Sequence, residues 1–195
     1  APNLHLIMQH SSPYNRSDYY GMGKAAIDIY ACINCGLCKE NCRFNAIKED
    51  DCNYQVDYYA CEGCGVCEEI CPIQAISIKP DISGELMLYK NDSIFSTAQL
   101  KMGSGNSGKL VSAVKNQLKA EAKNAELAII DGSPGIGCPV IASLSGVDMV
   151  LIVAEPSLSG ISDMERIILT AKNFDLKIGV CINKYDTNID NTKKI

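Results

Sequence analysis

Two runs of four cysteines constrain what this chain can fold into more than any other feature of its sequence. Both runs follow the spacing C-x2-C-x2-C-x3-C, and together they hold eight of the eleven cysteines. Three closely spaced thiolates can wrap one corner of an iron-sulfur cubane, and the fourth must come from farther along the chain. The spacing therefore predicts two 4Fe-4S clusters. Their predicted ligands are Cys32, Cys35, Cys38, Cys42, Cys61, Cys64, Cys67 and Cys71.

The second run repeats the first 29 positions later, and the match includes residues other than cysteine. Gly36 corresponds to Gly65, where glycine leaves room for the backbone near the inorganic core. A duplicated unit with two similar halves is therefore expected. In two-cluster bacterial ferredoxins, the fourth cysteine of each run ligates the other cluster. By that rule Cys71 completes the first cluster site and Cys42 completes the second.

Two other uses of eight cysteines are disfavoured by the same spacing. Zinc sites with four cysteines usually keep two C-x2-C pairs well apart, whereas here three thiolates crowd into residues 32–38. A disulfide framework needs an oxidising compartment, and no signal peptide is visible. Arg43 stands where the second run has Pro72, but this difference removes no ligand. The cluster interpretation is therefore preferred.

Composition narrows the classes of partner. The chain has 195 residues, enough for one medium domain that carries a small insert. Its net charge of -5, with acidic and basic residues interspersed, argues against nucleic acid as a partner. No apolar run approaches the roughly 18 residues that a membrane span needs. A soluble protein of a reducing cytoplasm is expected.

The segments that flank the cysteines predict the limits of an insert. Strands are expected at 24–30 and 75–79. Pro80, Asp81 and Gly84 follow, and residues of these types end a strand. We therefore place a two-cluster ferredoxin insert with an α+β fold at 23–80. Ahead of it, a short strand at 3–8 and a polar loop through 11–23 are expected. Behind it, strands at 85–89 and 94–102 flank a turn at Asn91 and Asp92.

The remainder of the chain alternates between strand and helix patterns. Apolar strands are predicted at 127–131, 149–154 and 176–182, and helices at 139–144 and 161–174; a further helix begins near Gly108 and carries Leu110, Val111, Val114 and Leu118 at helical spacing. Such alternation predicts an α/β fold with a mostly parallel sheet and helices on both faces. This domain would comprise 1–22 and 81–195, and ligands would bind beyond the carboxyl ends of its strands.

Two loops after predicted strands have residues suited to nucleotide binding. Asp131 ends an apolar strand, where an aspartate can hold magnesium, and the backbone N-H of Gly135 can sense a phosphate. An aspartate at this position can equally cap a turn. Asn183, Lys184 and Asp186 form an N-K-x-D sequence, in which the amide can bind a purine edge and the lysine stem can pack under the ring. The alternative is an ordinary polar loop.

Other motifs carry weaker predictions. Residues 103–109 match G-x4-G-K, but Leu110 stands where a phosphate loop needs a hydroxyl for magnesium, so the segment is interpreted as a glycine-rich start of a helix. Cys52 and Cys181 are interpreted as buried free thiols. Cys138 begins a helix, and the alternative is a metal bridge across a dimer.

Several motifs together carry a resemblance to a known family. They are PNLH at 2–5, the eight cysteines, SGKLV at 107–111, DGSPGIGCPV at 131–140, EPSLSG at 155–160 and INKYD at 182–186. In these motifs the chain resembles the MinD/ParA-type P-loop ATPases, specifically the subgroup with an inserted ferredoxin domain. The resemblance implies ATP, Mg²⁺ and a homodimer. It assigns Asp131 as the Walker B aspartate, Gly135 as the switch glycine and Asn183 as an adenine contact.

One part of the family pattern is missing from this sequence. The family carries a K-G-G-x-G-K-T phosphate loop on its first strand and helix, and residues 1–22 do not match it. The PNLH stretch is similar to the segment shortly after the switch I aspartate. We therefore expect the phosphate loop to lie upstream of Ala1. By itself the chain is expected to hydrolyse ATP weakly or not at all.

The preferred functional hypothesis is an ATPase that couples nucleotide state to electron transfer through two clusters to a partner protein. An alternative is an ATP-dependent carrier that assembles or delivers iron-sulfur clusters, although fully ligated clusters leave no open coordination site. A third is a spatial-positioning ATPase in which the clusters act as a sensor. Such an ATPase would usually have an amphipathic membrane-targeting tail. The sequence does not identify the electron donor or acceptor.

Overall fold

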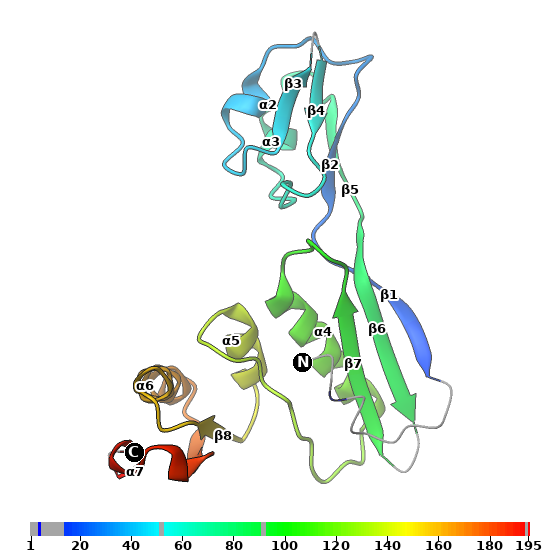
Figure 1. The fold of residues 1–195 in the computed structure, drawn as a ribbon. Helices are drawn as coiled ribbons and strands as arrows, with labels where there is room; N and C mark the ends of the chain where they lie inside the picture. Colours follow the sequence, from blue (N-terminus) through cyan, green and yellow to red (C-terminus); the bar gives the residue numbers. More distant parts are fainter. Residues whose placement is uncertain (1–3, 5–13, 51–52, 91–92, 194) are drawn as a thin grey trace. The chain divides into compact units, whose positions relative to one another are not determined.

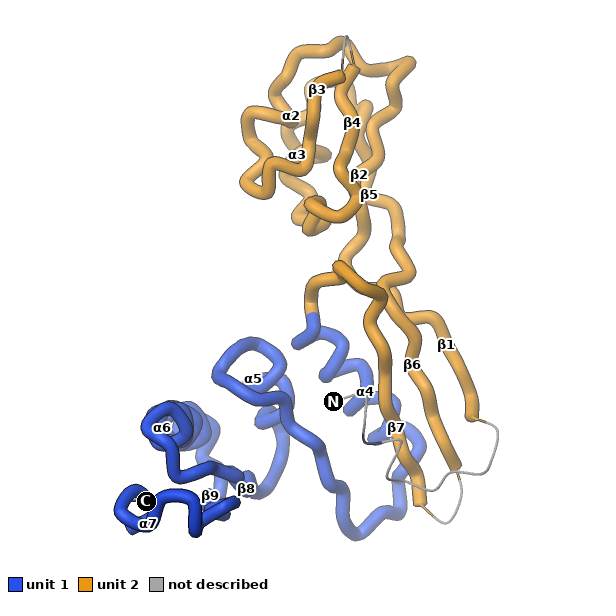
Figure 2. Tube along the Cα trace, viewed as in Figure 1, with its two compact units in different colours: residues 1–9, 107–195 blue, residues 10–106 orange. Residues whose placement is uncertain are grey.

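The structure is a computed structural model that describes residues 4, 14–50, 53–90, 93–193 and 195 (Figure 1). The chain forms two compact units, 10–106 and 1–9 with 107–195 (Figure 2). The turn predicted at Asn91 and Asp92, and Cys52, lie outside the described residues, as does nearly all of the strand predicted at 3–8. The predicted insert at 23–80 lies within the first of these units, and its limits stay a prediction.

Unit 10–106 contains a three-stranded antiparallel sheet in the order β1-β6-β7 (Figure 1). Its strands are β1 (Asn15–Tyr20), β6 (Ile82–Lys90) and β7 (Ile94–Leu100). The β6-β7 hairpin confirms the two strands predicted after the insert. The polar loop predicted through 11–23 is wrong for 15–20, because these residues pair with the long β6 as an edge strand. Only Tyr19 of β1 is buried, so hydrophobic alternation gave no strand signal.

The cysteine-bearing lobe of the same unit consists of two antiparallel strand pairs and two short helices. β2 (Lys24–Ile27) pairs with β5 (Ile76–Lys79), and β3 (Ile47–Asp50) pairs with β4 (Asn53–Val56). The helices are α2 (Leu37–Glu40) and α3 (Val66–Glu69). Each element of the first half recurs 29 positions later, so the duplication seen in the sequence extends to the fold. Strands at the predicted 24–30 and 75–79 are confirmed, though shorter.

The unit of 107–195 confirms most of the predicted α/β alternation. β8 (Met149–Ala154) and β9 (Lys177–Ile182) are parallel and are connected by α6 (Leu158–Lys172). The helix before them is α5 (Cys138–Leu144), and α4 (Ser107–Glu121) packs against it. The chain continues through the 3-10 helix η1 (Tyr185–Thr187) and α7 (Ile189–Thr192).

The apolar segment at 127–131 is not a strand, contrary to prediction. Leu127 is 76% exposed and Ile129 is 82% exposed, and the segment is coil. A strand requires a neighbouring strand to satisfy its N-H and C=O groups, and among the described residues β8 pairs only with β9. The apolar pattern alone could not supply that partner. The doubly covered parallel sheet therefore stays a prediction.

The two faces of β8 differ in their surroundings. Ile152 and Ala154 are buried and pack with Met164 of α6 in one apolar cluster. The alternate residues Met149, Leu151 and Val153 are more than half exposed. Because successive side chains of a strand point to opposite faces, α6 covers one face of β8 only.

This difference predicts unequal effects of truncation on stability. Ile152→Ala removes a side chain that is 5% exposed, and we expect it to lower the free energy of unfolding by about 2–5 kcal/mol. Leu151→Ala, at a residue 60% exposed on the opposite face, should change it by about 0.5 kcal/mol or less. Urea unfolding followed by circular dichroism measures both. Equal losses would show that the other face of β8 is also covered.

Candidate iron-sulfur site

The eight cysteines of the two runs line two cavities in the cysteine-bearing lobe. One cavity is lined by Cys32, Cys35, Cys38 and Cys71 and is called site A. The other is lined by Cys42, Cys61, Cys64 and Cys67 and is called site B. Each site thus receives three cysteines from one run and the fourth from the other. This is the grouping that exchange of the fourth cysteine requires, and it supports the predicted ligand sets.

Two glycines in left-handed conformations position the third cysteine of each run. Gly36 and Gly65 are the N-caps of α2 and α3, and both have φ 80. A residue with a Cβ atom is strained in this region, whereas glycine is not. The turn allows each short helix to begin directly after the second cysteine, which places Cys38 and Cys67 at its second position. The glycines are therefore explained by backbone geometry at the cluster sites.

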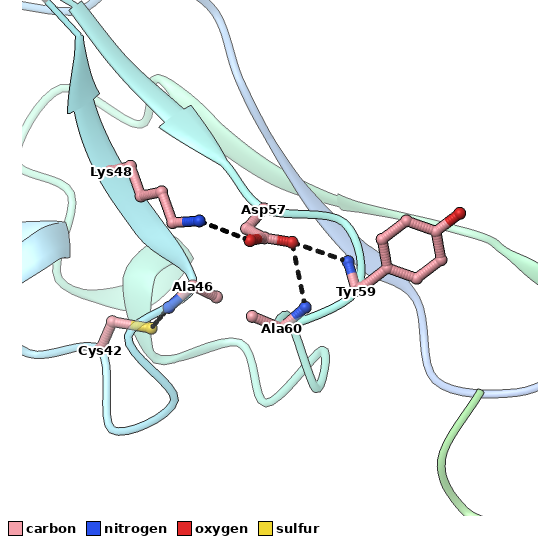
Figure 3. Close-up of polar contacts among 6 residues, drawn as sticks. All are labelled: Cys42, Ala46, Lys48, Asp57, Tyr59 and Ala60. Atoms are coloured by element: carbon pink, nitrogen blue, oxygen red, sulfur yellow. Dashed lines mark hydrogen bonds and ion pairs between the residues drawn. The ribbon is translucent and has the colours of Figure 1, made fainter. Parts of the chain in front are cut away.

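Two aspartates hold the loops that lead into the first cysteine of each run. Asp57 Oδ1 accepts hydrogen bonds from the backbone N-H groups of Tyr59 and Ala60, at 3.1 and 3.3 Å (Figure 3). Asp28 makes the same pair of bonds in the first half, to Tyr30 and Ala31. Neither aspartate was among the predicted site residues. The 29-residue repeat was the signal that could have identified them.

Each of these aspartates also ties one half of the lobe to the other. The backbone N-H of Asp28 donates to Ala75 O at 2.8 Å, and that of Asp57 donates to Ala46 O at 2.6 Å. Ala46 and Ala75 lie between the fourth cysteine of one run and the strand that follows it. The loop that begins one cysteine run is therefore fixed by the segment that ends the other.

Among the residues that the structure describes, Asp57 has an ion-pair partner and its counterpart Asp28 has none. Lys48 Nζ lies 2.7 Å from Asp57 Oδ2 (Figure 3). The hydrogen bond from Lys48 is the main cause that lowers the pKa of Asp57, and the N-H groups of Ala60 and Tyr59 add to it. Position 77, which corresponds to Lys48, is a serine.

The fourth cysteine of each run accepts a backbone hydrogen bond. The N-H of Ala46 donates to Cys42 Sγ at 3.3 Å, shown in Figure 3, and that of Ala75 donates to Cys71 Sγ at 3.2 Å. N-H donors to sulfur stabilise negative charge on it and are among the factors that set cluster potentials. Both halves therefore provide the same backbone donor to their exchanged cysteine.

Burial affects the third cysteine of each run. It is the main cause that raises the pKa of the Cys67 thiol to about 11, and the nearby Cys61 and Cys64 add to the effect. Burial also raises the pKa of Cys38, the corresponding residue of site A. Metal ligation requires the thiolate form, so the bound iron has to offset this cost.

The arrangement of donors fits a cluster better than a single ion. Within the described ranges, no three His, Cys, Asp or Glu side chains are grouped as ligands of one metal ion. A 4Fe-4S cluster binds one thiolate at each of its four irons. Its ligands are therefore spread around the cluster and do not converge on one atom. Four cysteines around a cavity, with soft sulfur donors throughout, meet that requirement at sites A and B.

The predicted nucleotide residues occupy two separate places in their unit. Asn183 and Lys184 directly follow β9, and the N-H of Asn183 donates to Ala154 O at the end of β8. Lys184 Nζ forms an ion pair with Glu155 Oε1 at 2.6 Å, and Asp186 lies in η1. Glu155 was not among the predicted site residues, although it follows β8 as Asn183 follows β9.

The other predicted residues of this unit lie near α4 and α5. Asp131 and Gly135 are on the coil that precedes α5, and Gly135 has φ 86, which favours glycine. Residues 103–106 lead into α4, which begins at Ser107, as expected for a glycine-rich helix start. Cys138 and Cys181 are exposed. For Cys181 this corrects the prediction of a buried thiol, because it alternates away from the face of β9 on which Ile178 packs against the cluster of β8 and α6.

Comparison with known proteins identifies the class of the cysteine-bearing lobe. Residues 54–77 match the 4Fe-4S binding domain family model, Fer4. The chain therefore contains a 4Fe-4S binding domain, which confirms the prediction of iron-sulfur binding. Within the part of the chain that the structure describes, no helix has the length and apolar character to cross a membrane.

Two curated relatives come from Methanocaldococcus jannaschii, and both are uncharacterized proteins. One is 40% identical over 159 residues, which cover 80% of this chain and 55% of the relative. The other is 33% identical over 84 residues, which cover 43% of this chain and 30% of the relative. The chain spans about half the length, or less, of the curated relatives it matches.

Exchange of the fourth cysteine can be tested by mutation. Cys71→Ala is expected to remove the cluster signals of residues 32–38, although Cys71 belongs to the second run, because it lines site A. Cys42→Ala, its matched control, should instead affect residues 61–67 at site B. Paramagnetic NMR of the anaerobic protein distinguishes the two. Loss confined to the run that contains the mutated cysteine would contradict the exchange.

The loop into Cys61 should depend on the charge of Asp57. Asp57→Asn keeps an oxygen acceptor for the two N-H groups but loses the ion pair, and we expect modestly faster release of iron from site B. Asp57→Ala removes both interactions and should release iron several-fold faster. Asp28→Asn is the control, because it removes charge where no lysine is paired. Release is followed by iron chelation, and equal rates in all three variants would contradict this role.

Proposed function

We propose that the chain is the electron-transferring part of an iron-sulfur ATPase, in which nucleotide state governs electron transfer to a partner protein. The observation that carries the proposal is the pair of four-cysteine cavities in one duplicated lobe. When bound at such sites, 4Fe-4S clusters supply one-electron transfer at low potential. Two clusters per chain are part of the proposal.

The packing of the lobe supports transfer between the two sites. A single apolar core contains buried cysteines of both, Cys38 from site A and Cys61 from site B. Cys32, Cys42, Cys67 and Cys71 pack against the same core. The sites are therefore separated by packed side chains and not by bulk water. A continuous protein medium favours passage of an electron from one site to the other.

Nucleotide binding is proposed for the unit of 107–195. The support is the parallel pair β8-β9, whose carboxyl ends bring Asn183 and Lys184 beside Glu155. Ligands of parallel α/β sheets bind at this edge. We propose the roles that the MinD/ParA resemblance implies for a longer protein: ATP and Mg²⁺ as ligands, Asp131 on magnesium, and Gly135 beside the phosphate. A homodimer and a cytoplasmic location belong to the same proposal.

In the unit of 10–106, the loop 103–106 packs on the residues just before and just after Cys61. A Cβ atom added at Gly103 would lie 3.2 Å from the Tyr59 ring, and one at Gly105 would lie 3.0 Å from a Glu62 carboxylate oxygen. The chain passes from this loop directly into α4.

Within the unit of 107–195, helix α4 packs against α5. A Cβ atom added at Gly108 of α4 would lie 3.1 Å from Cys138 Cβ, at the start of α5. At the other end of α5, Lys115 of α4 donates to Ala142 O and Ser143 O at 2.9 and 3.0 Å. Helix α4 thus holds both ends of α5, which follows the loop of Asp131 and Gly135. We propose that a movement of that loop is passed through α5 to α4.

The experiment uses the anaerobic full-length protein. We expect about eight irons per chain, and faster or slower oxidation of the dithionite-reduced protein when MgATP is present. Asp131→Asn should keep the iron content and lose the nucleotide effect. Stopped-flow absorbance measures the rates. If the oxidation rate were independent of MgATP, nucleotide coupling would be excluded. Transfer of labile clusters to an apo acceptor protein would instead favour an iron-sulfur cluster carrier.

A further inference from the structure

The two halves of the cysteine-bearing lobe differ in charge next to their ligands. Lys24 of β2 donates from Nζ to the backbone carbonyl oxygen of Cys61, at 2.6 Å. Its counterpart 29 positions later is Asn53 of β4, an exposed and uncharged residue. Site B therefore has an ammonium group on the backbone of one of its cysteines. Site A has a neutral residue at the corresponding position.

The ammonium group of Lys24 is held by more than one contact. It lies 5.0 Å from the ring centroid of Tyr58, and the Tyr58 hydroxyl donates to Asp81 Oδ1 at 2.7 Å. Lys24 is half-buried, so solvent screens its charge less than that of an exposed lysine. The residue that corresponds to Tyr58 in the first half is Ile29, which offers no aromatic face for a cation of its own.

We infer that Lys24 raises the reduction potential of a cluster at site B, so that site B accepts the first electron. This inference rests on the proposed function, because it requires a cluster at each site. Reduction adds one electron from a low-potential one-electron donor, with no bond formed or broken, and leaves the cluster one unit more negative. A nearby fixed cation stabilises that product, and cluster potentials respond to local charge and solvent exposure.

Other charged groups lie near both sites, among them the half-buried Glu68 next to Cys67, whose Oε1 accepts from the Ile78 N-H at 3.1 Å. Glu62 lines site B, but it is exposed and its carboxylate lies toward Gly105. At site A, Lys39 is exposed and paired with Glu49 at 2.8 Å, which offsets its charge. The buried Tyr54 lines site A, where site B has the smaller Ala25. A larger apolar ring excludes more water and further disfavours added negative charge at site A.

The test is a redox titration of the reconstituted chain with dithionite and mediators, followed by EPR. Paramagnetic NMR of residues 32–38 and 61–67 identifies which site is reduced. In the wild type we expect about a tenfold preference of the first electron for site B, which is 59 mV for a one-electron couple. Lys24→Gln should lower the potential of site B until the preference is about twofold or less, and leave site A unchanged. Lys24→Arg, which keeps the charge, should restore most of the preference.

Two further variants separate the contact from general charge. Lys79→Gln removes an exposed lysine that faces Lys24 across the β2-β5 ladder, and it should leave the preference unchanged. Asn53→Lys, combined with Lys24→Asn, moves the cation to the counterpart position and should shift the preference toward site A. An unaltered order of reduction in Lys24→Gln and in the exchanged pair would overturn the inference.

The outcomes also distinguish this inference from the proposed function. About four irons per chain would overturn the two-cluster proposal itself, whereas eight irons with identical potentials in every variant would overturn only the role of Lys24. If Lys24→Gln failed to hold a cluster at site B, Asn53→Lys alone would still decide. It leaves Lys24 in place and should narrow the gap between the sites, and an unchanged gap would overturn the inference.

Discussion

The two halves of the cysteine-bearing lobe are interlocked, because each four-cysteine cavity takes one cysteine from the opposite half. Cys71 of the second run lines site A, and Cys42 of the first run lines site B. The same dependence appears in the backbone, where Asp28 and Asp57 donate to carbonyl groups of the opposite half. A small lobe with few large apolar side chains gains stability from such reciprocal closure, and metal binding would add to it.

The charge state of the cysteines depends on their burial and on their backbone hydrogen bonds. Burial opposes the thiolate form at Cys38 and Cys67, while backbone N-H groups on Cys42 and Cys71 favour it. The two halves agree in these features because they share a backbone. They differ in side chains such as Lys24, Lys48 and Tyr54, which have no counterpart of the same type. A duplicated backbone can therefore hold two similar clusters in different electrostatic surroundings.

The predictions that held are those that depend on local sequence. Apolar spacing within short stretches of sequence predicted the helices α4, α5 and α6 and the strands β8 and β9. The glycine-rich segment at 103–109 was correctly interpreted as a helix start, because Leu110 already argued against a phosphate loop. The secondary-structure predictions that failed, at 15–20 and 127–131, concern strands, whose existence depends on a partner elsewhere in the chain.

The sequence by itself determined the cysteine spacing, the 29-residue repeat and hence the identity of the cluster ligands to be tested. These features are local, because each run of thiolates and each glycine turn lies within about ten residues. Only the tertiary structure decided that the polar β1 is an edge strand, that 127–131 stays coil and that Lys24 reaches Cys61 from 37 positions away. Each of these depends on which distant segment lies alongside, and local pattern carries no information about that.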